Sequence, residues 1–149
     1  MPRLAAPAAA IVAVLWVMLI VAAPALSAPV GGVLYAAGSV ICHQLPDRSF
    51  HVNGIQLPVC ARCFGLYTGG ALGAMIVATT RRLRASSRQP RSKIWFATAL
   101  AAIPTAVTFV AEWGLHWPVS NTSRAIAGLP LGFAAAVVVV SALATLHYE

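Results

Sequence analysis

The stretch from residue 42 to residue 63 reads CHQLPDRSFHVNGIQLPVCARC and interrupts a chain that is otherwise strongly apolar. It contains all three cysteines of the protein and two of its four histidines. Because 60% of the 149 residues are apolar and only 9% are charged, the composition fits neither a typical soluble domain nor a disordered chain. The sequence therefore predicts a membrane scaffold that holds one polar loop.

The apolar runs on both sides of this loop are long enough to cross a hydrocarbon core of about 30 Å. We predict an all-α membrane protein, a bundle of about four transmembrane helices with the polar Cys/His loop on its outer face. Residues 1–28 hold the first span, either a signal anchor or, as an alternative, a cleaved signal peptide. Residues 29–149 form the Cys/His-motif membrane domain, with further spans at about 60–80, 94–112 and 125–146.

Shorter features lie between the first two spans. Pro24, Pro29 and Gly31-Gly32 should break the helix, and the apolar run 33–41 is too short to span. We expect this run to form a short helix at the outer interface. In the polar loop 42–58, Asn53 and Gly54 predict a tight turn.

Glycines recur every four residues in two of the predicted spans. Gly65, Gly69 and Gly73 share one face of the second span, and Gly128 and Gly132 share one face of the fourth. Because glycine lets a neighbouring helix approach closely, these residues predict tight helix packing in lipid.

Basic residues cluster between the second and third spans, where the segment 81–93 carries no acidic residue. The positive-inside rule places such a segment in the cytoplasm. We therefore expect both termini in the cytoplasm and the Cys/His loop outside, in a bacterial inner or plasma membrane. Because the positive charge lies between two spans, it favours the lipid bilayer as the partner and argues against nucleic acid. The basic residues are Arg81, Arg82, Arg84, Arg88, Arg91 and Lys93.

With this topology, most polar residues that can do chemistry converge on the outer face. The loop before the second span and the loop after the third span both emerge there. The candidate site residues are Cys42, His43, Arg48, His51, Cys60, Arg62, Cys63, Glu112, Asn121 and Arg124.

The cysteines favour a metal site. The Cys60-x-x-Cys63 spacing at the start of a helix puts two sulfurs one turn apart on one face. With Cys42 and a histidine they form a Cys3His set suited to tetrahedral zinc. We take His43 as the fourth ligand, with His51 as the alternative.

The same spacing also fits two other kinds of chemistry. In a thiol oxidoreductase, the helix N-terminus and Arg62 would lower the pKa of a Cys-x-x-Cys thiol, and Cys42 would act as a resolving partner. A static disulfide is the third alternative, although a bond within Cys-x-x-Cys constrains the chain very little.

Glu112 is an acidic group near the end of an apolar span, where an unpaired charge is costly. It is expected to have a partner. An ion pair with Arg124 is one alternative, and a metal ligand or general base for a metal-bound water is the other. As an intramembrane carboxylate it is also the feature that a small transporter would use.

Arg48, Arg62 and Arg124 make the outer face able to hold an anion, such as a lipid phosphate or an anionic small-molecule substrate. Pairing with Asp47 or with phospholipid headgroups is the simpler alternative. Asn121 is expected to be a helix N-cap or turn residue.

One motif combines Cys42-His43-Gln44, Arg48-Ser49-Phe50 and Pro58-x-Cys60-x-Arg62-Cys63, and a second motif is Ser120-Asn121-x-x-Arg124. Together they resemble an uncharacterised family of small bacterial and archaeal integral membrane proteins, classed as a domain of unknown function. The resemblance covers roughly residues 34–140. An acidic residue, usually Asp followed by Gly, stands before the second motif in that family, and Glu112-Trp113 occupies its place here. The resemblance supports the choice of site residues and implies no activity.

The leading hypothesis is a membrane protein with a zinc site at its outer face. The role of this site stays open, and metal-dependent hydrolysis is one alternative. A membrane thiol oxidoreductase that uses Cys60 and Cys63 is the alternative, and a small transporter is the second alternative. The sequence does not decide whether the protein is an enzyme, nor its oligomeric state.

Overall fold

A computed structural model describes residues 5–80 and 91–145 of the chain. It contains four long helices, each long and apolar enough to cross a membrane. The predicted bundle of four membrane-spanning helices is thereby confirmed. The helices are α1 (Ala5–Ala22), α3 (Ala61–Thr79), α5 (Arg91–Trp113) and α6 (Asn121–Thr145).

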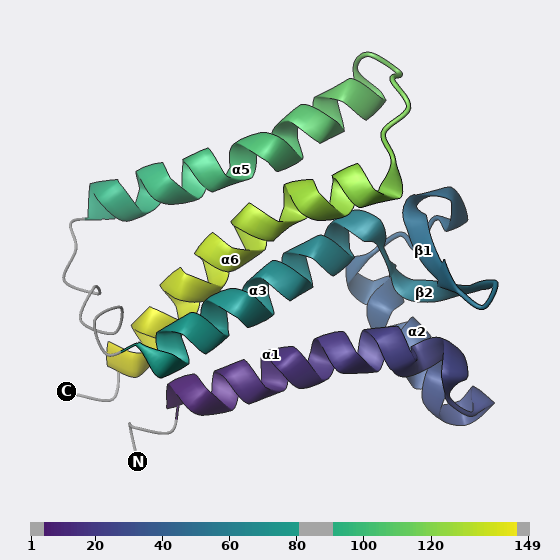
Figure 1. The fold of residues 1–149 in the computed structure, drawn as a ribbon, viewed down its shortest axis with the longest axis horizontal. Coiled ribbons are helices and arrows are strands. Elements are labelled where there is room, and N and C mark those ends of the chain that lie inside the picture. Colours follow the sequence, from purple (N-terminus) through teal and green to yellow (C-terminus); the bar gives the residue numbers. More distant parts are fainter. Residues whose placement is uncertain (1–4, 81–90, 146–149) are drawn as a thin grey trace.

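The four helices lie side by side in the order α1, α3, α6 and α5 (Figure 1). Helix α1 packs on α3, and α5 packs on α6. An apolar core of small residues, including Ala6, Ala74 and Val140, joins α1, α3 and α6. Helix α5 lies at the edge of the row, and Thr105 ties it to α6 by donating a hydrogen bond to the carbonyl oxygen of Ala127 at 2.7 Å.

Helices α3 and α6 approach each other through the predicted glycines. A Cβ atom on Gly65 would lie 2.0 Å from the carbonyl oxygen of Ala125, and one on Gly132 would lie 2.0 Å from that of Leu66. Such distances are well below van der Waals contact, so only glycine fits. The tight packing predicted from the glycine spacing is confirmed, and it brings the N-terminal ends of both helices together.

The shorter elements gather at one end of the bundle, beside the N-termini of α3 and α6 (Figure 1). They are the 3-10 turns η2 (Ala23–Ala25) and η3 (Pro46–Arg48), helix α2 (Ala28–Ile41) and strands β1 (Ser49–Val52) and β2 (Ile55–Cys60).

The short helix predicted over 33–41 begins earlier than expected, at Ala28. Pro29 does not break this helix because it stands in the first turn, where a missing N–H leaves no hydrogen bond unmade. The first helix ends at Ala22, and Pro24 lies in the turn η2 that follows, which agrees with the predicted break at this proline.

The segment predicted as a loop contains an antiparallel β-hairpin. Asn53 (φ 52°) and Gly54 (φ 79°) form its two-residue turn, which confirms the predicted turn. The alternation in β2 explains the strand, since Leu57 and Val59 point into an apolar cluster. Because β2 runs directly into α3, the second span begins at Ala61 and Cys60 stands at its N-cap.

The helices that contain the predicted third and fourth spans begin at Arg91 and Asn121. Of the basic segment, residues 81–90 lie outside the described residues. Its cytoplasmic location therefore stays a prediction from the sequence.

Candidate functional site

The fold brings the three cysteines together at the end of the bundle that carries the hairpin. Cys42 follows the last residue of α2, Cys60 is the N-cap of α3, and Cys63 lies one turn into that helix. Their three Sγ atoms all lie within 4.8 Å of one another. No disulfide joins these thiols.

Two glutamines hold the segments that carry Cys42 and Cys60 against each other. The side-chain amide of Gln44 donates to the carbonyl oxygens of Tyr35 and Pro58, each at 2.7 Å. The amide of Gln56 donates in turn to the carbonyl oxygen of Gln44 at 2.6 Å. Three backbone segments, α2, the stretch around Gln44 and β2, are thereby linked around the cysteines, which keeps their sulfurs close.

The sulfurs are also polarised by their immediate surroundings. The backbone N–H of Cys60 donates to the Sγ atom of Cys42 at 3.1 Å. Hydrogen bonding from the Cys63 thiol holds the pKa of the Cys60 thiol well below its usual value, although burial acts in the opposite direction. The N-terminus of α3 favours the same anionic state. A thiolate at Cys60 is the form that binds metals and attacks disulfides.

Apolar residues enclose the cysteines on the side of the bundle. Cys42 is buried, whereas Cys60 and Cys63 are half-buried. Aromatic rings complete this environment, with Trp16 edge-on to Tyr67 at 6.0 Å and Phe50 edge-on to Phe64 at 5.8 Å between ring centroids. The apolar cluster consists of Ile20, Cys42, Leu57 and Val59, with Trp16, Phe50, Cys60, Cys63, Phe64 and Tyr67 packed against it.

The two predicted histidine ligands lie apart from the sulfurs. His43 and His51 are both exposed, and neither belongs to the group of converging metal-ligand atoms. The structure therefore brings together three of the four predicted metal ligands.

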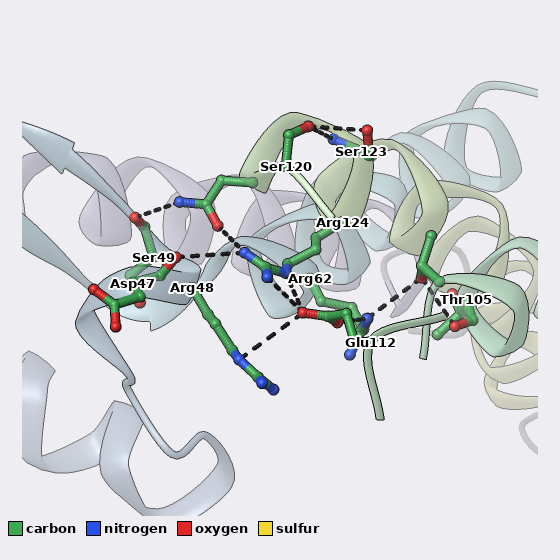
Figure 2. Close-up of polar contacts among 11 residues, drawn as sticks. Asp47, Arg48, Ser49, Arg62, Thr105, Glu112, Ser120, Ser123 and Arg124 are labelled. Carbon is green, nitrogen blue, oxygen red and sulfur yellow. Dashed lines mark hydrogen bonds and ion pairs between the residues drawn. The ribbon is translucent and has the colours of Figure 1, made fainter. Parts of the chain in front are cut away.

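Glu112 lies in a second cluster, formed by arginines (Figure 2). Its side chain is 3% exposed, and Oε2 accepts a hydrogen bond from Arg62 at 2.6 Å. Oε1 accepts from the Nε atom of Arg124 at 2.8 Å and also from its Nη2 atom. Since both carboxylate oxygens are engaged, the geometry favours the ion-pair alternative for Glu112 over the role of a base.

Arg48 completes this arginine–glutamate cluster, which comprises Arg48, Arg62, Glu112 and Arg124. Its Nε atom lies 3.9 Å from Oε1 of Glu112, and its guanidinium carbon lies 4.8 Å from the centre of the Trp113 ring. Each residue of the cluster thus comes from a different element, namely η3, α3, α5 and α6.

Asn121 connects the hairpin to the arginine–glutamate cluster. Its amide donates to the carbonyl oxygen of Ser49 at 3.0 Å, and its side-chain oxygen accepts from Arg124. The N-cap role expected of Asn121 belongs to Ser120, whose hydroxyl accepts the backbone N–H of Ser123 at 3.1 Å.

Sequence reasoning missed the positioning role of the glutamines and of Ser49. Ser49 is fully buried and donates to the carbonyl oxygen of Leu45 at 2.9 Å. Gln44 and Ser49 belong to the motif strings quoted above, and this membership was the one sequence feature that could have indicated their role. Gln56 has no comparable signal in the sequence.

Comparisons with known proteins agree with a membrane protein. A family model described as "Predicted membrane protein (DUF2085)" matches residues 42–138, which include both clusters. An uncharacterised protein of Methanocaldococcus jannaschii, MJ1492, is 41% identical over 101 residues, or 67% of this chain. The alignment spans 62% of that archaeal protein, so the chain covers less than two thirds of its length.

A second uncharacterised protein, from Methanothermobacter thermautotrophicus, is 32% identical over 104 residues, which are 65% of this chain and 82% of that protein. Both relatives are archaeal and therefore do not support the bacterial source that was expected. No solved structure matches the chain.

Proposed function

The chain belongs to the DUF2085 family of predicted membrane proteins, and we propose that its three cysteines bind a thiophilic metal ion, zinc in the first place. The observation that carries this proposal is the convergence of the three Sγ atoms within 4.8 Å of one another. Zinc–sulfur bonds of about 2.3 Å in a tetrahedral site would bring such sulfurs to roughly 3.8 Å from each other. The site needs only a small contraction to take up the ion.

The apolar surroundings of the cysteines favour a metal over three free thiolates. Several negative charges on adjacent sulfurs are costly beside residues such as Leu57 and Val59. A divalent cation would reduce the net charge of three thiolates to about −1. Zinc therefore suits the charge of the site as well as its donor atoms.

The fourth coordination position is the feature that decides between a structural and a reactive site. His43 would close the site if its side chain turned inward from its exposed position. Without it, water or a substrate would take this place. Hydrolysis would then need a base other than Glu112, because both oxygens of that carboxylate already bind arginines.

We place the cysteines on the extracytoplasmic side of the membrane, with both termini in the cytoplasm. The support is the basic segment between α3 and α5, which joins these helices at the ends remote from the cysteines. The arginines Arg48, Arg62 and Arg124 support an anionic lipid or small molecule as a further partner. No feature of the described residues favours the transporter alternative, since Glu112 is engaged in an ion-pair cluster.

Metal analysis of the detergent-purified protein tests the metal proposal. We expect about one zinc ion per chain, and its loss in Cys60→Ser. His116→Asn is the matched control, because it removes an exposed histidine that lies outside the predicted ligand set and should leave the zinc content unchanged. His43→Ala tests separately whether a histidine closes the fourth coordination position. Metal-free protein, with two of its three thiols oxidised, would overturn the proposal.

A second candidate, a membrane thiol oxidoreductase, is favoured by the lowered pKa of Cys60 beside Cys63. The Cys60 thiolate would attack a partner disulfide and release one partner thiol. Cys63 would then displace the second thiol, so that the partner is reduced and a Cys60–Cys63 disulfide forms. Cys63→Ser should trap the mixed disulfide if this candidate is correct, whereas a metal site gives no such adduct.

A further inference from the structure

The arginine–glutamate cluster carries more positive than negative charge. Arg48, Arg62 and Arg124 surround one carboxylate, that of Glu112. Within residues 5–80 and 91–145 the other acidic residue is Asp47, and it forms no ion pair there. Two guanidinium charges are therefore left without a counter-charge beside the apolar part of the bundle.

Two of the arginines are held in place by Glu112. The side chains of Arg62 and Arg124 are 17% and 12% exposed, respectively. The Nε atom of Arg62 is buried and has no hydrogen-bond partner in the described part of the chain. These arginines are thus preorganised, and one of them retains an unused donor.

Arg48 is held more loosely than the other two. Its side chain is 30% exposed, and its contact with Glu112 is the long one of 3.9 Å through Nε. Figure 2 shows its terminal nitrogens pointing away from Glu112. The Trp113 ring supports the guanidinium plane from one side. A planar donor fork is therefore presented to the outside of the cluster.

Exposed tryptophans follow Glu112 in the sequence. Trp113, the last residue of α5, and Trp117, four residues beyond it, are 57% and 65% exposed. Tryptophans are enriched at membrane–water interfaces, which supports a position of the cluster at the depth of lipid headgroups. Arg62 and Arg124 stand in the first turns of α3 and α6, whose N-termini add positive potential at the same place.

From this geometry we infer that the arginine–glutamate cluster binds a phosphate group, with Arg48 as the arginine that closes on it. Guanidinium groups bind phosphate oxygens in pairs of parallel hydrogen bonds, and phosphate supplies the missing negative charge. The phosphate belongs either to an anionic phospholipid or to a soluble phosphate ester. The inference deepens the proposed anionic partner but uses no metal ligand, so it can fail or hold independently of the metal site.

Native mass spectrometry of delipidated protein in detergent tests this site. We expect phosphatidylglycerol to bind more tightly than phosphatidylcholine, and Arg48→Gln to weaken its binding about tenfold, the value of one charged hydrogen bond. Arg48→Lys should recover part of the loss, because it keeps the charge without the planar fork. Lys93→Gln is the matched control, since it removes one exposed positive charge from the opposite end of α5.

Competition with glycerol 3-phosphate distinguishes the two sources of phosphate. If only a large excess of glycerol 3-phosphate displaces the lipid, the site is a lipid site. If glycerol 3-phosphate itself binds tightly, the ligand is a soluble ester. Either result supports the inference, provided that Arg48→Gln weakens the binding. Equal binding of the lipid and of glycerol 3-phosphate by wild type, Arg48→Gln and Lys93→Gln would overturn it. Equal binding of phosphatidylcholine and phosphatidylglycerol, without tight binding of glycerol 3-phosphate, would also overturn it. A folded Arg48→Gln variant is expected, because Arg62 and Arg124 still balance Glu112.

Discussion

The cysteine cluster and the arginine–glutamate cluster flank the same helix start but differ in almost every physical property. Cys60 and Cys63 bracket Arg62 in sequence. The sulfurs face apolar and aromatic residues, and their hydrogen bonds are to one another and to nearby backbone N–H groups. The guanidinium of Arg62 turns instead to Glu112, where charges are paired at 2.6 Å.

This difference shows that polar residues on one face of a membrane protein need not form one site. Thiolate sulfurs in apolar surroundings suit a thiophilic metal ion, whereas oppositely charged side chains that form ion pairs fix one another's position. Glu112 therefore holds the arginines in place and has no role at the sulfurs. Variants that affect one cluster and spare the other test this division.

The largest effect is expected from Glu112→Ala. Removing the carboxylate leaves Arg62 and Arg124 partly buried without a counter-charge, which should lower the free energy of unfolding by about 3–5 kcal/mol. Metal content per folded chain should stay unchanged. Denaturation in mixed detergent together with metal analysis measures both quantities. Glu112→Gln should cost less, since it can still accept hydrogen bonds, and metal loss from a folded variant would contradict the division.

Gly69→Ala should disturb both clusters, because α3 carries a residue of each. A Cβ atom at Gly69 would lie 2.1 Å from the carbonyl oxygen of Leu129, so α3 and α6 must separate. We expect a loss of about 1–3 kcal/mol in the free energy of unfolding. Gly70→Ala is the control, since its Cβ would find only a contact at 3.7 Å. Equal stability of the two variants would refute the close approach.

Gln44→Asn should act on the cysteine cluster alone. Asparagine tolerates the positive φ of 48° at this position, but its shorter side chain cannot reach both Tyr35 and Pro58. Loosening the support of the ligands should weaken zinc binding by about 10–100-fold. A competitive chelator titration measures this change. Unaltered zinc affinity in the folded variant would show that the glutamine does not position the sulfurs.

The smallest effect is expected from Asn121→Ala, which removes the link between the hairpin and Arg124. Loss of the hydrogen bond to Ser49 should cost about 0.5–1.5 kcal/mol of unfolding free energy. Thr122→Ala, at an exposed neighbouring position, serves as the control in the same unfolding measurement. If the two variants are equally stable, the link contributes nothing measurable.

The bundle and its closest helix pair could be predicted because lipid imposes simple rules. Apolar runs of sufficient length predict spans, and the glycine spacing of Gly65 and Gly69 predicts the contact face. The hairpin was harder, since Leu57 and Val59 alternate over only a few residues. The glutamine network escaped prediction because Gln44 and Gln56 act on backbone carbonyls, which carry no sequence signal.

The sequence by itself determined the membrane helices, the turn at Asn53-Gly54 and the list of polar residues at one end. Only the tertiary structure decided how those residues divide, with the three cysteines in one cluster, Glu112 with the arginines in another, and His43 and His51 in neither. The physical reason is that periodicity and length place residues on elements, whereas partners depend on how elements from distant parts of the chain pack. The backbone approach of α3 and α6 sets that packing.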